Sequence, residues 1–301
     1  MKAYYQRWNE IPGNIRGCLI VLVASLVAVI MSALIKQVGK DIPVVEILFI
    51  RQSLVLIIIS PVIFRNIDSV FVTGVFRMHF LRSAFSVVAM FTGFTAIVHL
   101  PLAEATAISF VRTLFTTILA IIFLRELVGI RRWSSVVIGF IGVLIIVRPS
   151  PENINVYALL AMTSALFVSC INIVMRKLSR IDKSSTIMAY QSIFITVVMA
   201  GPAYYYWVTP TYDEVLLVLM IGGLMSLMQW LFIQAFKAGE AAAIAPMEYF
   251  RLLYAVVIGV IFFAEIPTVW TVTGAAIIML STLYTMHRNA VKNDAKVPDG
   301  L

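Results

Sequence analysis

Two similar stretches of sequence decide the fold. The first is Pro101-Leu102-Ala103-Glu104-Ala105-Thr106-Ala107, which opens an apolar run ending at Glu126, and the second is Ala238-Gly239-Glu240-Ala241-Ala242-Ala243, which opens a run ending at Glu265. Each run carries one arginine near its middle, Arg112 or Arg251, and the two copies are offset by about 136–140 residues, close to half the chain. An arginine at bilayer depth is costly, so each one needs a reason. The chain is therefore predicted to be a membrane protein built from two related halves.

The composition is that of an integral membrane protein. Hydrophobic residues make up 61% of the chain and charged residues 13%, whereas soluble domains have about 25% charged residues. The net charge of +8 does not indicate nucleic-acid binding, because the basic residues lie in short segments between apolar runs. Both cysteines, Cys18 and Cys170, lie within apolar runs and predict no disulfide framework. The three histidines lack metal-ligand spacing, so neither a metal nor another cofactor is expected.

Ten apolar segments are predicted to cross the membrane as helices of about 20 residues. They are 17–36, 43–64, 79–100, 101–124, 131–148, 156–177, 185–207, 214–236, 241–263 and 267–286. The predicted fold is therefore an all-α integral membrane protein with ten transmembrane helices. Residues 1–16 and 287–301 form the terminal segments outside the spans.

The distribution of lysine and arginine predicts the orientation of the chain. Apart from three arginines within spans, the basic residues on one side of the membrane are Lys36, Lys40 and Arg148. All other lysines and arginines fall in segments on the opposite side. Because cytoplasmic loops are enriched in these residues, both termini are expected in the cytoplasm.

Residue matches between the halves extend beyond the opening stretches. Lys36 of the first span matches Arg176 of the sixth, Phe94 of the third matches Trp230 of the eighth, and Gln52-Ser53 matches Gln191-Ser192. Each repeat, 17–148 and 156–286, then contains five spans. Since five is odd, the second copy enters the membrane from the opposite side, and the repeats are inverted. Inverted repeats are typical of carriers with a midplane site and alternating access.

Several polar side chains within the spans are candidates for lining a substrate cavity. Ser109, Arg112, Thr113 and Thr116 are expected to share one helical face of the fourth span. Glu248 and Arg251 are spaced i, i+3 in the ninth span. The remaining candidates lie on the first, sixth and eighth spans and are Ser32, Asn172, Trp230 and Gln234. We expect these side chains to converge between the two halves.

The same residues also allow structural roles. Ser and Thr in membrane helices often bond to their own i−4 carbonyl, and small polar residues also mediate helix packing. Glu248 and Arg251 could form a structural ion pair within one helix. Arg112 has no acid within its own turns, so its partner is expected on another helix or in the substrate.

Three further charged residues are predicted to be structural. Arg51 is expected to lock its span to another helix. Glu126 and Glu265 end their helices, where negative charge is unfavourable, so each is expected to bond to the following loop or to a helix start.

Two motif copies resemble the EamA-type members of the drug/metabolite transporter superfamily. The first is Glu104-Ala105-Thr106-Ala107-Ile108-Ser109-Phe110 through Glu126, followed by Arg132-Trp133 and Gly139-Phe140-Ile141-Gly142. The second is Ala245-Pro246-Met247-Glu248-Tyr249 through Phe262-Phe263-Ala264-Glu265. Relatives often place a proline directly after the arginine of the fourth span, where this chain has Thr113, and the ninth span has Leu252 at that point.

The resemblance implies ten helices, cytoplasmic termini, and a cavity lined by spans one, three, four, six, eight and nine. It also implies a bacterial inner-membrane carrier of small metabolites. Within the family, the sequence around Glu248 and Arg251 looks closest to that of a group of S-adenosylmethionine or riboflavin transporters. The deep arginines outnumber the deep glutamates, which favours an anionic or zwitterionic metabolite.

The alternatives are a lipid-linked sugar flippase and, less favoured, a membrane-embedded enzyme, for which no clustered acids or histidines are visible. The expected partners are the substrate and the bilayer. The sequence leaves open a coupling proton or ion, for which Glu248 is a candidate, and a homodimer.

Overall fold

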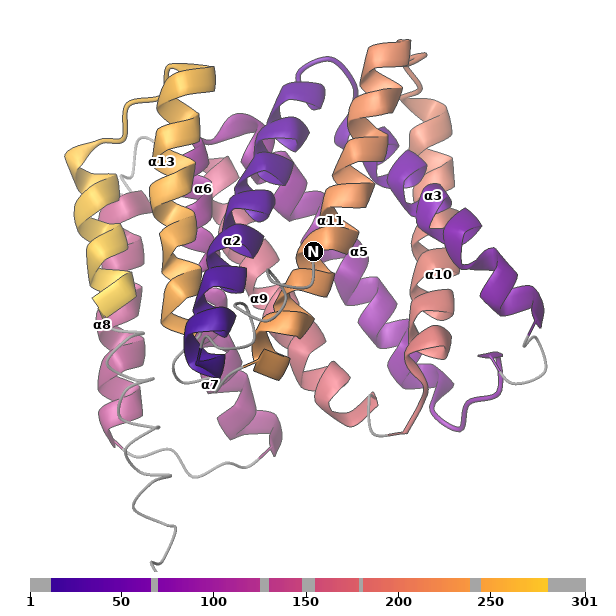
Figure 1. Cartoon of the computed structure of the whole chain (residues 1–301), viewed down its shortest axis with the longest axis horizontal. Helices are drawn as coiled ribbons and strands as arrows, with labels where there is room; N and C mark the ends of the chain where they lie inside the picture. The colour runs from indigo at the N-terminus through magenta and orange to yellow at the C-terminus, as the bar shows by residue number, and fades with distance from the viewer. Residues whose placement is uncertain are drawn as a thin grey trace, which may run out of the picture.

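The computed structural model describes residues 12–65, 70–124, 130–147, 155–178, 181–238 and 245–280, and within these ranges the chain is helical, without strands. The helices stand side by side as a bundle, with α8 and α13 at one edge and α3 and α10 at the other (Figure 1). Their bounds are α2 Gly13–Val38, α3 Val44–Arg65, α5 Phe76–His99, α6 Leu102–Ser109, α7 Arg112–Leu124, α8 Ile130–Val147, α9 Val156–Leu178, α10 Ser184–Tyr205, α11 Tyr212–Ala238, the 3-10 turn η1 Ala245–Tyr249 and α13 Phe250–Phe263, followed by a helix at Val269–Leu280.

Six of these helices are long and apolar enough to cross a bilayer, namely α2, α3, α5, α9, α10 and α11. Their outward surfaces are apolar; Ile57 and Ile58 of α3, for example, are 67% and 69% exposed. Helices satisfy their backbone hydrogen bonds internally, as spans in lipid must. The chain is thus a multi-pass membrane protein. The other predicted spans are shorter or interrupted in the described part of the chain.

The fourth predicted span is not one helix, and this corrects the sequence interpretation. It is divided at Phe110 and Val111, whose backbone N–H groups bond three residues back, to Ala107 at 3.2 Å and to Ile108 at 3.0 Å. Both side chains enter the core, with 3% and 0% exposure. The tight turn lets two consecutive side chains be buried. Consequently Ser109, which precedes the break, does not share a continuous helical face with the polar residues of α7.

The ninth predicted span is also irregular where the structure describes it. Residues Ala245–Tyr249 form the 3-10 turn η1, and the α-helix α13 begins only at Phe250. Both breaks lie next to a deep arginine, Arg112 in one repeat and Arg251 in the other. Short 3-10 stretches inside longer helical segments often mark functional positions.

The helices pack in matching pairs. The most extensive contacts join α2 with α11 and α5 with α9, followed by α3 with α10. Smaller contacts join α7 with α9, α13 with α2, and α6 with α13. Each pair therefore combines a helix of the first half with one of the second, so the protein has a single interior shared by both halves.

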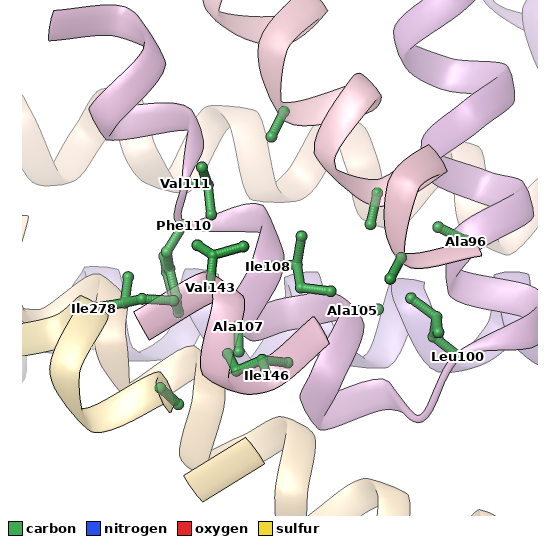
Figure 2. Close-up of a cluster of buried hydrophobic side chains, with 14 of the residues drawn as sticks. Ala96, Leu100, Ala105, Ala107, Ile108, Phe110, Val111, Val143, Ile146 and Ile278 are labelled. Carbon is green, nitrogen blue, oxygen red and sulfur yellow. The ribbon is translucent and has the colours of Figure 1, made fainter. Parts of the chain in front are cut away.

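The largest apolar cluster surrounds the break between α6 and α7. Figure 2 shows Phe110 beside Val143 of α8 and Ile278 of the final helix. Close by, α8 and the final helix approach through glycines: a Cβ added at Gly274 would lie 2.5 Å from the backbone oxygen of Gly142. This backbone approach requires glycine and holds the final helix against α8.

Candidate functional site

An ion pair joins the two helix breaks. Nη2 of Arg112, the first residue of α7, donates a hydrogen bond to Oε1 of Glu248 in η1. The side chains are 33% and 28% exposed, so the pair is accessible to a small ligand. The structure therefore pairs Glu248 across the two repeats. The sequence had allowed an ion pair within one helix, between Glu248 and Arg251.

Two aromatic rings lie next to this ion pair. Phe110 and Tyr249 come from the same two breaks, and their ring centroids are 4.9 Å apart at an interplanar angle of 55°. Tilted rings at this distance attract one another. The breaks are thus held together by an apolar contact as well as by charge.

The backbone at Arg112 is fixed by two hydroxyl groups. Thr116 Oγ1 donates to the Arg112 carbonyl oxygen at 2.7 Å. Ser169 Oγ of α9 lies 2.7 Å from the same carbonyl and 2.8 Å from that of Ala165, so its one proton is shared between them. The bond from Ser169 ties the start of α7 to α9, and the two bonds together position the arginine. For Thr116 the structure shows the i−4 bonding that the sequence had allowed.

Arg251 lies at the start of α13 and adds a second positive charge near the pair. Its Nε atom is buried and has no hydrogen-bond partner in the described residues. The group of Arg112, Glu248 and Arg251 therefore carries a formal surplus of one positive charge. In a low-dielectric interior such a surplus attracts an anionic group strongly.

The other predicted cavity residues are dispersed. Ser32 is 3% exposed and bonds to the Ala28 carbonyl at 3.0 Å, and Ser109 bonds to the Thr106 carbonyl at 2.7 Å. These hydrogen bonds of Ser32 and Ser109 stay within their own helices and do not reach the Arg112–Glu248 pair. The exposed candidates are Thr113, Asn172 and Trp230, and Gln234 is half-buried.

A groove with a volume of about 550 Å³ runs along the second half of α11, lined by Met228, Gln229, Phe232, Ile233 and Lys237. Phe232 packs against Val21 and Ala235, and so does Met247, the neighbour of Glu248. The groove therefore runs beside η1. Its volume lies within the range of about 300–1,000 Å³ typical of small-molecule sites.

The end of the bundle near Leu100 is closed by a network centred on Glu265. Its Oε1 accepts a hydrogen bond from Lys36 Nζ of α2, and its Oε2 accepts one from the Leu102 backbone N–H at 2.7 Å. Lys36 Nζ also donates to the Leu100 carbonyl oxygen. One carboxylate thus ties together α2, the start of α6 and the end of α13. The predicted bond of Glu265 to a helix start is present, on α6 rather than on the next element. Glu126 lies outside the described residues.

The backbone turns sharply to place this carboxylate. Ala264 has a φ of 54°, the left-handed conformation that glycine prefers, and the Glu265 N–H bonds to the Gly259 carbonyl at 3.0 Å. The Glu265 side chain folds back over Gly259, where an added Cβ would lie 3.3 Å from Oε2.

A third ion pair, at the other end of the bundle, was not anticipated from the sequence. His79 Nε2 of α5 lies 2.7 Å from Asp182 Oδ2, in the loop between α9 and α10, and Thr73 donates to the same oxygen at 2.7 Å. Burial by itself raises the pKa of Asp182, but the hydrogen bonds from Thr73 and His79 and the charge of His79 hold this pKa below its ordinary value. The residues are more than 100 positions apart, and no local pattern in the sequence connects them.

Arg51 contacts other helices, but without a salt bridge in the part of the chain described. Its guanidinium carbon lies 5.7 Å from the ring centroid of Phe94 on α5. Glu46, on the same helix, instead accepts a hydrogen bond from the Val208 backbone N–H at 3.1 Å.

Several apolar spanning helices are paired across the two halves of the chain, and charged side chains lie at two helix breaks. This arrangement is typical of membrane transporters. Residues 15–148 and 155–286 each match the EamA-like transporter family. The chain belongs to this family, and it is a transporter rather than an enzyme.

Curated relatives match over most of their length. The chain is 30% identical to an S-adenosylmethionine uptake transporter of Rickettsia bellii, covering 89% of this chain and 91% of the relative. It is 28% identical to a riboflavin transporter of Vibrio cholerae, with 90% and 92% covered, and 26% identical to a pseudopaline exporter of Pseudomonas aeruginosa, with 89% and 94% covered.

A crystal structure shares the fold. It superposes with a TM-score of 0.58 at 17% sequence identity, covering 91% of this chain and 98% of the solved chain. At this identity the likeness concerns the fold alone.

Proposed function

We propose that this protein is a secondary carrier that moves a small polar metabolite, zwitterionic or anionic, across the inner membrane of a bacterial cell. The observation that carries the proposal is the Arg112–Glu248 ion pair, which joins the helix breaks of the two repeats. Relatives named for S-adenosylmethionine, riboflavin and pseudopaline support a small-molecule substrate. None of these matches favours a lipid-linked sugar flippase.

The substrate class follows from the charges at the breaks. A zwitterion can replace each member of the ion pair, its carboxylate binding an arginine and its cationic group binding Glu248. A carboxylate alone would be drawn by the surplus positive charge of Arg112 and Arg251. In both cases the substrate exchanges one set of charge-assisted hydrogen bonds for another, which limits the cost of removing the charges from water.

Alternating access is supported by the pairing of the helices. If α2, α3, α5 and α7 of the first repeat correspond to α9, α10, α11 and α13 of the second, exchanging the repeats converts the α2–α11 contact into the α5–α9 contact. It also converts α2–α13 into α7–α9 and leaves α3–α10 unchanged. A two-fold relation between the repeats predicts this exchange, and such a relation supports alternating access around a shared site.

The closed end and the groove fit one state of such a cycle. The Glu265 network closes the end that, by the distribution of basic residues, is expected outside. The groove lies along the second half of α11, toward Lys237, on the side expected to face the cytoplasm. This arrangement fits a carrier open toward the cytoplasm. Among the described residues at the breaks, Glu248 is the candidate for carrying a coupling proton.

The test begins by finding a ligand that binds the purified protein. The purified protein is screened by thermal shift with S-adenosylmethionine, riboflavin, methionine and other amino acids, because a ligand of the folded state raises the Tm by mass action. The ligand found is then followed as a radiolabelled substrate into proteoliposomes. Arg112→Ala and Glu248→Gln should each lower uptake at least about tenfold, the effect of losing roughly 1.4 kcal/mol of binding. Arg77→Gln, on the exposed first turn of α5, is the matched control.

Two results would overturn the proposal. Unchanged uptake and affinity in both Arg112→Ala and Glu248→Gln would remove the ion pair from the substrate site. Saturable flipping of a lipid-linked sugar, without uptake of any soluble metabolite, would favour the flippase. If the residual uptake of Glu248→Gln no longer responds to a pH gradient while the uptake of the wild type and of Arg77→Gln does, proton coupling is assigned to Glu248.

A further inference from the structure

A short segment without helical structure connects α13 to the final helix. It consists of residues 264–268 and is called the strap below. Ile266, in its middle, is 83% exposed. At its far end Thr268 Oγ1 accepts a hydrogen bond from the Thr271 N–H at 3.2 Å, which caps the final helix. Because the cap lies within the last residues of this connection, the strap can move without unwinding the final helix.

One side chain ties the strap to the first repeat. The carboxylate of Glu265 binds Lys36 of α2 and the Leu102 N–H of α6, and no other hydrogen bond described for the strap reaches these helices. The backbone just before it is strained, because Ala264 has a φ of 54°. The bonds of Glu265 hold the strap in place against this strain.

A small cavity with a volume of about 30 Å³ lies under the strap, enough for a water molecule. Its walls include Glu104 of α6, Ala255 of α13 and Thr271 of the final helix. Glu104 is half-buried and close enough to Lys36 for their charges to attract one another. Lys36 therefore has two carboxylates within reach, Glu265 from the second repeat and Glu104 from the first.

The second carboxylate makes it less costly to release the first. The side chain of Lys36 is 7% exposed, and a buried cation left without a counter-charge is strongly destabilising. If the strap moves away with Glu265, Lys36 keeps the Leu100 carbonyl as an acceptor, and Glu104 supplies a negative charge. Both partners then belong to the first repeat. The lysine is thus paired with the strap in place and with the strap displaced, as a switch between two states requires.

We propose that the strap is a gate at this end of the bundle and that Lys36 is its switch, bound to Glu265 when the gate is closed and to Glu104 when it is open. Opening breaks the bonds between Glu265 and the first repeat, relieves the strain at Ala264 and exposes the cavity to water. The inference rests on the carrier cycle of the proposed function, for which it names the moving segment and the charges that control it.

The test measures how often the cavity under the strap opens. Thr271, which is 6% exposed, is replaced by cysteine in a chain whose Cys18 and Cys170 are serines, and its reaction with a maleimide is timed on the purified protein in detergent. Glu265→Gln weakens the closed state and should speed labelling at least about fivefold. Glu104→Gln weakens the open state and should slow labelling at least about twofold.

Two controls separate opening of the gate from general loosening of the fold. Asp213→Asn, at the exposed start of α11, should leave the labelling rate of Thr271→Cys unchanged. Ser192→Cys serves as a second reporter, because Ser192 is 1% exposed on α10, and α10 lies at the opposite edge of the bundle from α13 (Figure 1). Its labelling rate should be the same with Glu265 and with Glu265→Gln.

Opposite effects of the two glutamate substitutions are the result that supports the gate. The proposal is overturned if Glu265→Gln does not speed labelling of Thr271→Cys, if it speeds labelling of Ser192→Cys equally, or if Glu104→Gln does not slow labelling. If Glu265→Gln does not fold, Glu104→Gln decides alone, because it leaves the bond between Lys36 and Glu265 in place.

Failure of the gate and failure of the proposed function give different results. The labelling rates need no substrate, whereas the proposed function is tested by uptake. Uptake that depends on Arg112 together with labelling that ignores both glutamates would remove the gate and keep the carrier. Labelling that responds as expected, without uptake of any soluble metabolite, would keep a moving strap and remove the proposed function.

Discussion

Replacing Glu265 with glutamine tests whether charge holds the closed end of the bundle together. The carboxylate accepts hydrogen bonds from the Lys36 ammonium group and from the Leu102 N–H. Glutamine keeps an oxygen for Leu102 but loses the negative charge. Lys36, whose side chain is 7% exposed, would then retain only the Leu100 carbonyl of its described hydrogen-bond partners.

The size of the effect follows from this geometry. Breaking a buried ion pair by removing one partner costs about 3–5 kcal/mol. Because the Glu265 side chain is 20% exposed and Lys36 keeps a carbonyl, we expect a smaller loss, about 2–3 kcal/mol in the free energy of unfolding. At about 2 °C per kcal/mol for a chain of this length, the Tm should fall by about 4–6 °C.

The assay is thermal unfolding of the purified protein in detergent, followed by intrinsic fluorescence. Asp213→Asn, the matched substitution at the exposed start of α11, should change the Tm by less than about 1 °C, as surface changes do. The double variant Lys36→Met, Glu265→Gln removes both charges and should recover at least half of the loss. An unchanged Tm in Glu265→Gln, or a double variant less stable than the single one, would refute the reasoning.

Three further predictions concern stability. Gly274→Ala should lower stability by about 1–3 kcal/mol through overpacking, whereas Gly201→Ala, which meets nothing within 4 Å, should be neutral or stabilising in the same melting assay. Ala264→Gly should raise stability by up to about 1 kcal/mol, because glycine adopts the positive φ without strain; an unchanged or lower Tm would contradict this. Asp182→Asn should lower the Tm at pH 6, and the difference in Tm from the wild type should shrink as the pH falls. Because the pKa of Asp182 is lower in the folded than in the unfolded protein, its ionised carboxylate stabilises the fold above the unfolded pKa of about 3.9, and this stabilisation is lost as the pH falls through the folded pKa. A difference in Tm between Asp182→Asn and the wild type that grows toward low pH would contradict this prediction.

The positions of the long helices were predictable because the bilayer requires apolar segments of one length. The six long helices overlap the segments predicted at the same places. The break in the fourth predicted span was not predictable, because the residues at which it occurs, Phe110 and Val111, are neither proline nor glycine. Their tight turn comes from the burial of two adjacent side chains in a core built by α8 and the final helix.

The candidate site was predicted in part. Arg112 was expected to find an acid on another helix or in the substrate, and the structure supplies Glu248. Ser169, which fixes the backbone of Arg112, is 57 positions away in the sequence, and only the packing of α9 against α7 brings the two residues together. Arg51 was expected to hold its span to another helix, and its guanidinium lies beside Phe94 of α5, a contact that no local sequence pattern specifies.

The sequence alone determined that this chain is helical, crosses a membrane and consists of two related halves, because hydropathy and repeats act along the chain. Only the tertiary structure decided which charges meet. Glu248 is three residues from Arg251 but pairs with Arg112, 136 positions away, and Lys36 pairs with Glu265, 229 positions away. Helical spacing fixes the face on which a side chain lies. The packing of helices from different halves fixes the side chain that lies opposite.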